Sequence, residues 1–336
     1  MRHMRWYAAL FLTCAAMAAP KTLDIYFIDV EGGQATLIVT PSKQTMLIDA
    51  GWPGFENRDA KRITATAKKA GVKKLDYVLT THYHRDHSGG VPEIAALMTV
   101  GTFIDHGANR ETGKAADELF KDYQKVFEAA KRLQVKAGDT LPLKDVKMEV
   151  LSADGTVLSS PRAGAGKPNP LCASEKKKAD DPSENARSVG TLLTYGKFRF
   201  IDLGDLTWNK ELELACPENK IGEVDVYLTT HHGMDASGSA AIVHALHPRV
   251  AIMNNGAKKG GTAPAWQAIH SSPGLEDFWQ LHYADAGGKE NNTADAFIAN
   301  PVEDGAANWI RLSAEASGAF TVYNSRNKYS KTYAAR

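Results

Sequence analysis

The chain has 336 residues, of which 43% are hydrophobic and 24% are charged, and its formal net charge is +1. This composition provides enough apolar material for a sizeable core and excludes a disordered chain. Acidic and basic residues nearly balance, so the net charge does not favour a nucleic acid as a partner. Local runs of basic residues leave such a partner open.

The first residues have the pattern of a secretory signal peptide. Arg2 and Arg5 precede a short apolar stretch, and Ala16-Met17-Ala18 is typical of a cleavage site. The apolar stretch is too short to span a bilayer, and no later segment is long and apolar enough to do so. We therefore predict a cleaved signal peptide at residues 1–18 and a periplasmic or secreted protein of residues 19–336 without a membrane span.

The chain contains three cysteines, and two of them would remain after this cleavage. Cys172 and Cys216 would then face an oxidising compartment, where cysteines can pair. Pairing requires Cα atoms within about 7 Å of each other, so paired and unpaired thiols both stay open. Lipid attachment at Cys14 is a less favoured alternative, because Thr13 is unlike the small residue that usually precedes such a cysteine.

Strand-like runs alternate with helical ones along the rest of the chain. The alternation indicates an α/β protein with one domain. Short apolar or β-branched runs predict strands at 23–29, 34–40, 45–49, 75–79, 191–195, 198–203, 224–229 and 250–253. Helical spacing predicts helices at 58–70, 90–98, 115–133 and 237–246.

Residues 159–184 differ from the rest of the domain. They are rich in proline, glycine and lysine, and they have almost no apolar periodicity. This composition predicts a long loop or flexible insertion. Such loops often cover binding sites, and a surface excursion without a role is the other interpretation.

The densest group of chemically active side chains follows the predicted strand at 75–79. His82, His84, Asp86 and His87 lie within six positions and are followed by Ser88-Gly89-Gly90. These nitrogen and oxygen donors suit zinc or a similar divalent ion. In extended backbone His82 and His84 point to the same side, and after a turn Asp86 and His87 can face a second ion.

Two later strands also end in candidate ligands. Gly204-Asp205 follows the predicted strand at 198–203, and Thr230-His231-His232-Gly233 follows the one at 224–229. A carboxylate such as that of Asp205 has two oxygens and a negative charge that two cations can share.

The pattern His82-x-His84-x-Asp86-His87 resembles the signature of the metallo-β-lactamase superfamily of dinuclear metallohydrolases. The resemblance implies a four-layer αββα sandwich and two divalent ions, with zinc preferred and manganese or iron as alternatives. It implies metal ligands at His82, His84, Asp86, His87, Asp205 as the bridge, and one of His231 and His232. We favour His231 as the ligand and His232 as a catalytic group in the pocket. Asp49 matches an aspartate that orients the first motif, although a turn residue at a strand end is an equal interpretation.

The chain departs from most of the superfamily between the first motif and Asp205. Residues 107–230 contain no histidine, and Asn185-Ala186-Arg187-Ser188-Val189 occupies the corresponding stretch. With segment 29–36 and His-His-Gly, this pattern resembles the branch that contains the nuclease-like domain of DNA-uptake channels and the phosphorylcholine esterases of teichoic acid. Asn185 or Ser188 is then a weak ligand or a substrate contact, and single-metal occupancy is an alternative to two metals.

The resemblance implies an exported metal-dependent hydrolase that uses a metal-bound hydroxide on a small-molecule or cell-envelope phosphodiester. Asp86 would hold metal and orient the nucleophile, and Asn254 could contact substrate. His232 and His282 are candidates to protonate the leaving group, although a packed histidine is the preferred interpretation of His282. The alternatives are a lactone or amide hydrolase, including one for β-lactams, and a non-catalytic envelope binding protein with a degenerate site. The sequence does not indicate the oligomeric state.

Overall fold

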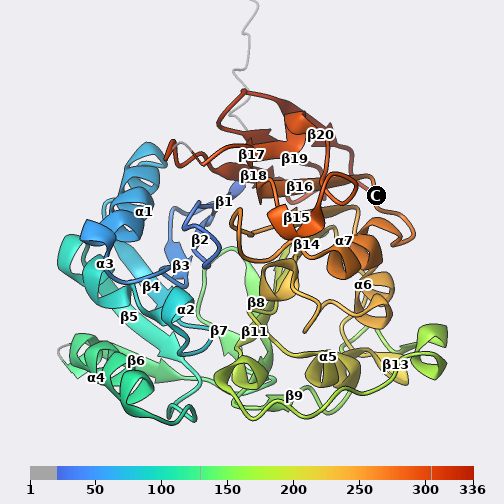
Figure 1. Ribbon diagram of the computed structural model, residues 1–336, viewed down its shortest axis with the longest axis horizontal. Coiled ribbons are helices and arrows are strands. Elements are labelled where there is room, and N and C mark those ends of the chain that lie inside the picture. Colours follow the sequence, from blue (N-terminus) through green and yellow to red (C-terminus); the bar gives the residue numbers. More distant parts are fainter. Residues whose placement is uncertain (1–20, 129, 304) are drawn as a thin grey trace, which may run out of the picture.

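A computed structural model describes residues 21–128, 130–303 and 305–336 of the chain (Figure 1). The predicted signal peptide at residues 1–18, with Cys14, lies outside the described residues. Two nine-stranded sheets dominate the fold, and a small sheet pairs β10 (Lys167–Pro168) with β13 (Glu218–Asn219).

The first sheet has the strand order β20-β19-β18-β1-β2-β3-β4-β5-β6. Neighbours from β3 to β6 pair in parallel, and the other neighbours pair antiparallel. Its strands are β1 (Leu23–Phe27), β2 (Thr36–Val39), β3 (Thr45–Ile48), β4 (Leu75–Leu79), β5 (Val100–Asp105), β6 (Lys131–Gln134), β18 (Ile310–Ala314), β19 (Phe320–Asn324) and β20 (Ser330–Tyr333).

The second sheet has the order β17-β16-β15-β14-β12-β11-β8-β7, with β9 paired to β8. Neighbours from β12 to β17 pair in parallel, and the others pair antiparallel. Its strands are β7 (Thr140–Leu141), β8 (Lys147–Ala153), β9 (Thr156–Val157), β11 (Gly190–Tyr195), β12 (Phe198–Asp202), β14 (Val226–Leu228), β15 (Val250–Met253), β16 (Asp277–His282) and β17 (Ile298–Asn300).

Helices cover the outer face of each sheet, on opposite sides of Figure 1. The first sheet is covered by α1 (Arg58–Lys69), α3 (Val91–Leu97) and α4 (Lys114–Glu128), with the short α2 (Arg85–Ser88) near the centre. The second is covered by α5 (Trp208–Ala215), α6 (Ala240–Leu246) and α7 (Ala263–His270). Single turns occur at η1 (Phe55–Asn57), η2 (Pro170–Ala173), η3 (Glu184–Arg187), η4 (Thr230–Gly233), η5 (Asp285–Gly287) and η6 (Asp295–Phe297). Within the described ranges, no helix has the length and apolarity needed to cross a membrane.

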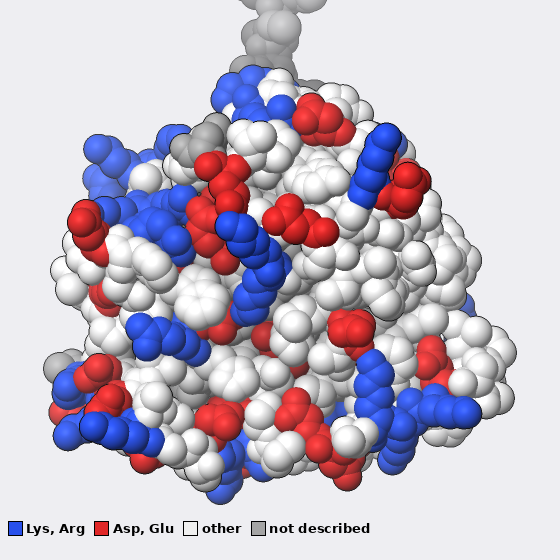
Figure 2. Space-filling view, viewed as in Figure 1, with Lys and Arg blue, Asp and Glu red and all other residues white. Residues whose placement is uncertain are grey.

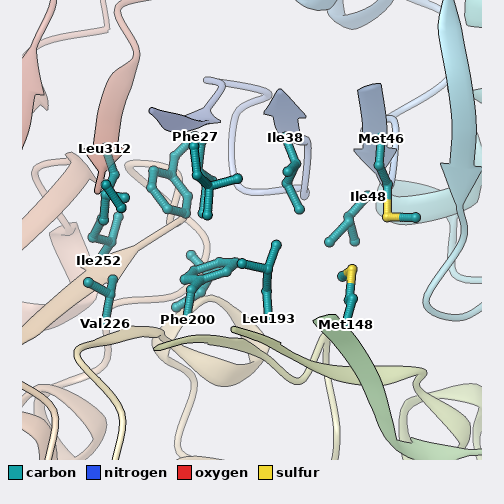
Figure 3. Packing of buried hydrophobic residues seen from close by; sticks show 14 of the residues in the cluster. Phe27, Ile38, Met46, Ile48, Met148, Leu193, Phe200, Val226, Ile252 and Leu312 are labelled. Carbon is teal, nitrogen blue, oxygen red and sulfur yellow. The ribbon is translucent and has the colours of Figure 1, made fainter. Parts of the chain in front are cut away.

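The main core lies between the two sheets (Figure 3). In β1, Ile25 and Phe27 point into this core, whereas Tyr26 packs beneath the outer helices, because successive strand side chains alternate between faces. Phe27 meets Phe200 of the opposite sheet at a ring-centroid distance of 5.8 Å. Burying one such side chain contributes about 1.5–3 kcal/mol, so the facing sheets hold the sandwich together. The predicted αββα architecture is confirmed.

The predicted helix at residues 115–133 is wrong at its C-terminal end. Helix α4 ends at Glu128, and Lys131–Gln134 forms β6 at the edge of the first sheet. Lysine, arginine, leucine and glutamine all suit a helix, and the sequence pattern therefore continued through them. Parallel pairing with β5, in which Lys131 lies opposite Thr102, decides the conformation instead.

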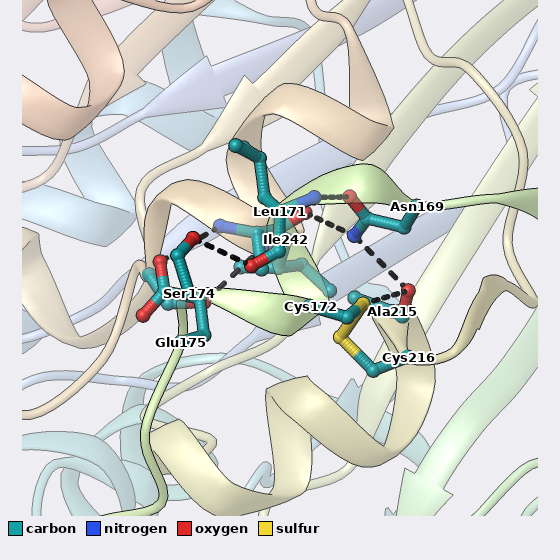
Figure 4. Close-up of a disulfide and its surroundings, with 10 residues drawn as sticks. Asn169, Leu171, Cys172, Ser174, Glu175, Ala215, Cys216 and Ile242 are labelled. Atoms are coloured by element: carbon teal, nitrogen blue, oxygen red, sulfur yellow. Dashed lines mark hydrogen bonds between the residues drawn. A yellow bond between two sulfur atoms is a disulfide. The ribbon is translucent and has the colours of Figure 1, made fainter.

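The segment at residues 159–184 has little regular structure, as predicted, but it is fastened to the second sheet's helices (Figure 4). Cys172 forms a disulfide with Cys216, at a Cα–Cα distance of 5.7 Å, which settles the open question of pairing. Asn169 Nδ2 donates hydrogen bonds to Ala215 O at 3.1 Å and Ala241 O at 2.9 Å. The predicted flexibility of the segment remains a prediction.

Candidate metal centre

The candidate ligands lie where strands of both sheets end. The first motif follows β4, and a backbone bond from Val189 N to Thr81 O at 2.8 Å joins it to the second sheet. Within the second sheet, His231 N donates to Gly204 O at 3.0 Å and so joins the segments that follow β12 and β14. Gly204 has φ +57°, and a Cβ there would lie 3.0 Å from Thr81 Cβ. Glycine at this position therefore lets the loop after β12 approach the first motif closely.

Four buried residues bring ligand atoms together. Asp86, His87, Asp205 and His232 each offer one such atom, and these atoms all lie within 4.8 Å of one another. His87 Nε2 is 3.2 Å from Asp86 Oδ2 and 3.2 Å from Asp205 Oδ2. His232 Nε2 is 3.3 Å from Asp86 Oδ2 and 3.4 Å from Asp205 Oδ1. Two imidazoles and two carboxylates at such spacing form a donor set for a divalent cation.

Asp205 also faces two further imidazoles. Its Oδ2 is 3.4 Å from His231 Nε2 and 4.0 Å from His82 Nε2. His82 Nε2 and Asp205 Oδ1 are both buried, and neither has a hydrogen-bond partner among the residues that the structure describes. Buried polar atoms are nearly always paired, so these two unpaired atoms fit a centre in which a metal ion supplies the missing partner. The position of Asp205 among four histidines fits the predicted bridging role.

Asp49 and Thr81 set the orientation of two histidine rings. His87 Nδ1 lies 2.7 Å from Asp49 Oδ2, and the Thr81 hydroxyl donates to the same oxygen at 2.6 Å. A carboxylate accepts from His87 Nδ1–H, which leaves the lone pair on Nε2. Because the Thr81 hydroxyl donates to Asp49, it accepts from His82 Nδ1–H at 3.1 Å. Both Nε2 atoms are thereby left as free donors to a metal, and the role predicted for Asp49 fits these contacts.

His84 is held differently from the other histidines. Its Nε2 lies 3.1 Å from Glu111 Oε2, and its side chain is 30% exposed. A hydrogen bond from Nε2–H to this carboxylate leaves Nδ1 as the atom with a lone pair. The rings of His82 and His84 lie edge to face with centroids 4.7 Å apart. Glu111 was not predicted, because it lies on a loop 27 residues from His84 and has no motif around it.

His231 and His232 both direct Nε2 toward Asp205. His231 Nδ1 lies 3.3 Å from the hydroxyl of Ser237, which donates to Leu206 O and so accepts from the imidazole. His232 Nδ1 donates to Asn254 O at 3.3 Å. Successive left-handed conformations, with φ of 54° and 55°, place both rings on the same side. The four-residue cluster contains His232, so the geometry supports metal binding by this histidine, and His231 remains a predicted ligand.

The other predicted residues have supporting or separate positions. Ser188 Oγ accepts from Asp205 N at 3.2 Å and lies 3.4 Å from His82 Nδ1. Asn254 Nδ2 donates to Gln34 Oε1 at 3.1 Å, and its backbone oxygen lies 3.3 Å from His232 Nδ1, so its contact with substrate stays a prediction. Asn185 Oδ1 is buried and lacks a hydrogen-bond partner.

His282 belongs to a second buried group. Its Nε2 lies 2.7 Å from Asp29 Oδ1, and Asp29, Glu31 and His282 form another compact set of possible ligand atoms. Arg62 already fills this set, with Nη1 3.0 Å from Asp29 Oδ2 and 2.9 Å from Glu31 Oε1. The packed interpretation of His282 fits this arrangement, whereas proton donation to a substrate does not.

The surroundings keep the two central carboxylates ionised. Burial alone would raise the pKa of Asp205, but the imidazoles of His232, His87 and His231 hold it well below its usual range. The pKa of Asp86 is likewise raised by burial but lowered further by His87 and His232, and the net shift is well below the usual range. Both carboxylates are therefore in the anionic form that binds a metal ion.

Lys259 is a further polar group at the centre that the sequence did not indicate. Its Nζ donates a hydrogen bond to Asp86 Oδ2 and lies 5.2 Å from the centroid of the Trp52 ring. A lysine in a glycine-rich loop has no spacing that predicts such a contact. On the face seen in Figure 2, acidic side chains border the basic ones, including the blue cluster at the upper left.

Comparison with known proteins identifies the family of the first half of the chain. Residues 28–166, which contain His82, His84, Asp86 and His87, match the family model of the metallo-beta-lactamase superfamily. No curated protein matches the chain in sequence. The branch within the superfamily remains a prediction.

Several solved structures are similar to this one. The metallo-beta-lactamase fold protein YhfI from Bacillus subtilis has a TM-score of 0.47 and 11% identity, over 77% of this chain and 96% of that one. CmlA, a diiron beta-hydroxylase from Streptomyces venezuelae, has a TM-score of 0.41 and 16% identity, over 76% and 48%. A diphosphatase of the PhnP family has a TM-score of 0.37 and 13% identity, over 70% and 87%. Residues 28–166 of the chain therefore match the metallo-beta-lactamase superfamily, and the two-sheet sandwich has the αββα architecture predicted from the resemblance.

Proposed function

We propose that this protein is an exported metal-dependent hydrolase that acts on phosphodiesters. The observation that carries the proposal is the convergence of imidazoles on Asp205. The Nε2 atoms of four histidines (His82, His87, His231 and His232) lie within 4.0 Å of its carboxylate oxygens. Hydrogen bonds on the opposite side of each ring leave these atoms free to bind a metal.

The donor set would hold one or two divalent ions. His87, His232, Asp86 and one oxygen of Asp205 would hold the first, and His82 and His84 with the other Asp205 oxygen would hold the second. Zinc, manganese and iron all accept such mixed nitrogen and oxygen donors. When bound, such ions lower the pKa of a water molecule from about 15.7 towards neutrality and neutralise charge on phosphoryl oxygens.

The protein's own residues fix the geometry in which this chemistry would occur. Asp49 and Thr81 hold His87 and His82 in one tautomer each, and Glu111 does so for His84. His82 and His87 are fully buried, so bulk water does not compete for their nitrogen atoms. Rigid, dry placement of ligands is what pre-organises a site for charge that develops on a reacting oxygen.

Two observations support a phosphodiester over a lactone or an amide. The sequence has Asn185 to Ser188 where most of the superfamily has a histidine, as in the phosphoester-cleaving branch that it resembles. The ammonium of Lys259 adds a positive charge at the edge of the centre, where an anionic substrate would approach.

The experiment compares two substrates with metal-stripped and metal-reloaded protein. We expect hydrolysis of bis-p-nitrophenyl phosphate that disappears with a chelator and returns with zinc, manganese or iron, and little turnover of a chromogenic cephalosporin. Rapid cephalosporin turnover with an inert phosphodiester would contradict the proposal. Protein that binds no metal and stays inactive after reloading would instead favour a binding protein with a degenerate site.

Export is supported by the signal-peptide pattern and by the disulfide between Cys172 and Cys216, since disulfides persist in oxidising compartments. The test is expression in a bacterium with a periplasm, followed by fractionation and mass spectrometry. We expect a periplasmic or secreted chain that begins at Ala19. A full-length chain confined to the cytoplasm would contradict export.

A further inference from the structure

The loop between β15 and α7 brings Lys259 to the candidate metal centre through close backbone contacts. Gly256 N donates to Lys259 O at 2.9 Å, and Gly261 N donates to His232 O at 3.0 Å. A Cβ at Gly256 would lie 2.8 Å from Gly32 N, and one at Gly260 would lie 2.1 Å from His232 O. Only glycine allows such proximity, so the backbone of Lys259 is fixed against the histidine turn.

The Lys259 side chain lies at the boundary between the centre and solvent. Its ammonium donates to Asp86 Oδ2 and lies 5.2 Å from the centroid of the Trp52 ring. The side chain is 29% exposed, whereas that of Asp86 is 9% exposed. The ammonium is therefore accessible to a ligand that approaches from solvent.

A bound divalent ion would change the partners of this ammonium. Asp86 Oδ2 also lies 3.2 Å from His87 Nε2 and 3.3 Å from His232 Nε2, so this oxygen points at the position of the ion. An ion at that position would claim the charge of Asp86 and repel the ammonium. The ammonium then requires another anion, and an anionic oxygen bound beside the ion would satisfy both positive charges.

We propose that Lys259 binds a non-bridging oxygen of the substrate's phosphoryl group. The inference rests on the proposed function and adds a substrate-binding residue to it. Lys259 would hold the anionic group against the metal centre and stabilise the charge that builds up on it during reaction. Charge-assisted bonds from lysine to phosphate are stronger than neutral hydrogen bonds, so the contribution should be large enough to measure.

The neighbouring lysine provides a matched control. Lys258 Nζ lies 3.3 Å from Glu303 Oε2, and its side chain is 77% exposed. It has the same chemistry as Lys259, lies in the same loop and makes its ion pair at the surface. Substituting each lysine by methionine removes one charge while keeping a side chain of similar length, so only the position of the lost charge differs.

The experiment uses zinc-loaded wild type, Lys259→Met, Lys259→Arg and Lys258→Met. For each, calorimetry measures binding of inorganic phosphate, metal analysis gives the zinc content, and kinetics gives kcat and KM for bis-p-nitrophenyl phosphate. For Lys259→Met we expect phosphate binding about 10- to 100-fold weaker and a corresponding loss in kcat/KM, with zinc content unchanged. Lys259→Arg should retain part of the binding, and Lys258→Met should match wild type.

Three outcomes distinguish anion binding by Lys259 from the proposed phosphodiester hydrolysis. Unchanged phosphate binding by Lys259→Met would overturn the inference, and so would loss of zinc in that variant, since it would show that the lysine only supports the centre. If wild type binds phosphate through Lys259 but hydrolyses no phosphodiester with any metal, the anion-binding inference holds and the proposed reaction fails.

Discussion

Among the described residues, two groups of at least three histidine and carboxylate side chains bring possible ligand atoms together, and they differ in how well they suit a metal ion. At Asp205, four imidazoles converge on one carboxylate, and His82 Nε2 lacks any hydrogen-bond partner. At Asp29, the guanidinium of Arg62 pairs with the carboxylates of both Asp29 and Glu31, and its side chain is only 12% exposed. The two groups therefore differ in how far side-chain cations occupy them: Arg62 pairs with both carboxylates of the second group, whereas Lys259 pairs with Asp86 at the edge of the first.

At a further buried carboxylate, that of Glu211, the effect of burial on the pKa outweighs the effect of neighbouring charges. Burial raises the pKa of Glu211 to about 7, whereas nearby positive groups lower the pKa values of Asp29 and Asp205. No ion pair to Glu211 is found among the described residues. A protein fold thus treats a buried acid in one of three ways: it pairs it with arginine, surrounds it with imidazoles, or leaves it to take up a proton.

The largest expected effect separates the first two groups. Asp205→Asn should abolish zinc binding at the position that Asp205 would bridge. Loss of a residue that only orients a metal ligand reduces activity by up to about 100-fold, and loss of Asp205 should reduce hydrolysis by more than that. The matched variant Asp29→Asn should keep its zinc, because Arg62 already occupies that group as its cation. Metal analysis after dialysis measures both. Equal loss of zinc in the two variants would break the distinction between the groups.

Removing Arg62 should destabilise the fold, because Asp29 and Glu31 would lose their shared cation. In Arg62→Met, Asp29 and Glu31 lose the guanidinium whose Nη1 lies 3.0 Å from Asp29 Oδ2 and 2.9 Å from Glu31 Oε1. Because Asp29 is buried and would keep only His282 as a charged partner, the free energy of unfolding should fall by about 3 kcal/mol, as measured by urea denaturation. Arg110→Met removes an exposed pair with Asp154 and should change stability little. A comparable loss in both variants would contradict the buried-pair interpretation.

The protonation of Glu211 predicts a pH dependence of stability. Its folded pKa of about 7 lies above its ordinary value of 4.5, so the folded state binds more protons between these pH values. The free energy of unfolding should therefore fall as pH rises from about 4.5 through about 7, by up to about 3 kcal/mol from this residue. Glu211→Gln should remove that slope. If the difference between the wild-type and variant curves stays constant with pH, Glu211 does not titrate as described.

The smallest expected effect concerns the outer partner of His84. Glu111→Gln weakens the acceptor for His84 Nε2, which lies 3.1 Å from Oε2, and should reduce zinc affinity about 10-fold. Glu118→Gln, at an exposed position with Lys114 3.9 Å away, is the matched control and should leave affinity unchanged. Competition with a chelating dye measures both, and equal affinities for the two variants would show that Glu111 does not support the centre.

The sequence predicted those parts of the centre that short-range patterns encode. His82, His84, Asp86 and His87 form one compact motif, and a strand followed by Gly-Asp identified Asp205. The ring orientations of His231 and His232 depend on two left-handed residues and on Ser237 and Asn254, which no local pattern reveals. The edge strand β6 was missed for the same reason, because its pairing with β5 is a contact between distant segments.

Contacts between distant loops were the part of the centre that the sequence indicated least. Glu111 reaches His84 across 27 residues, and Lys259 reaches Asp86 across 173. Both are common surface residue types, and their roles arise only when two loops meet. Asp29 and His282, 253 residues apart, show the converse, since a candidate catalytic histidine proved to be part of a buried ion-pair group.

X-ray anomalous scattering from crystals of the zinc-loaded mature protein tests the central claim most directly. This account predicts anomalous peaks between Asp205 and the surrounding histidines, with one bounded by Asp86, His87 and His232. No peak there, or a peak between Asp29 and His282 instead, would contradict it.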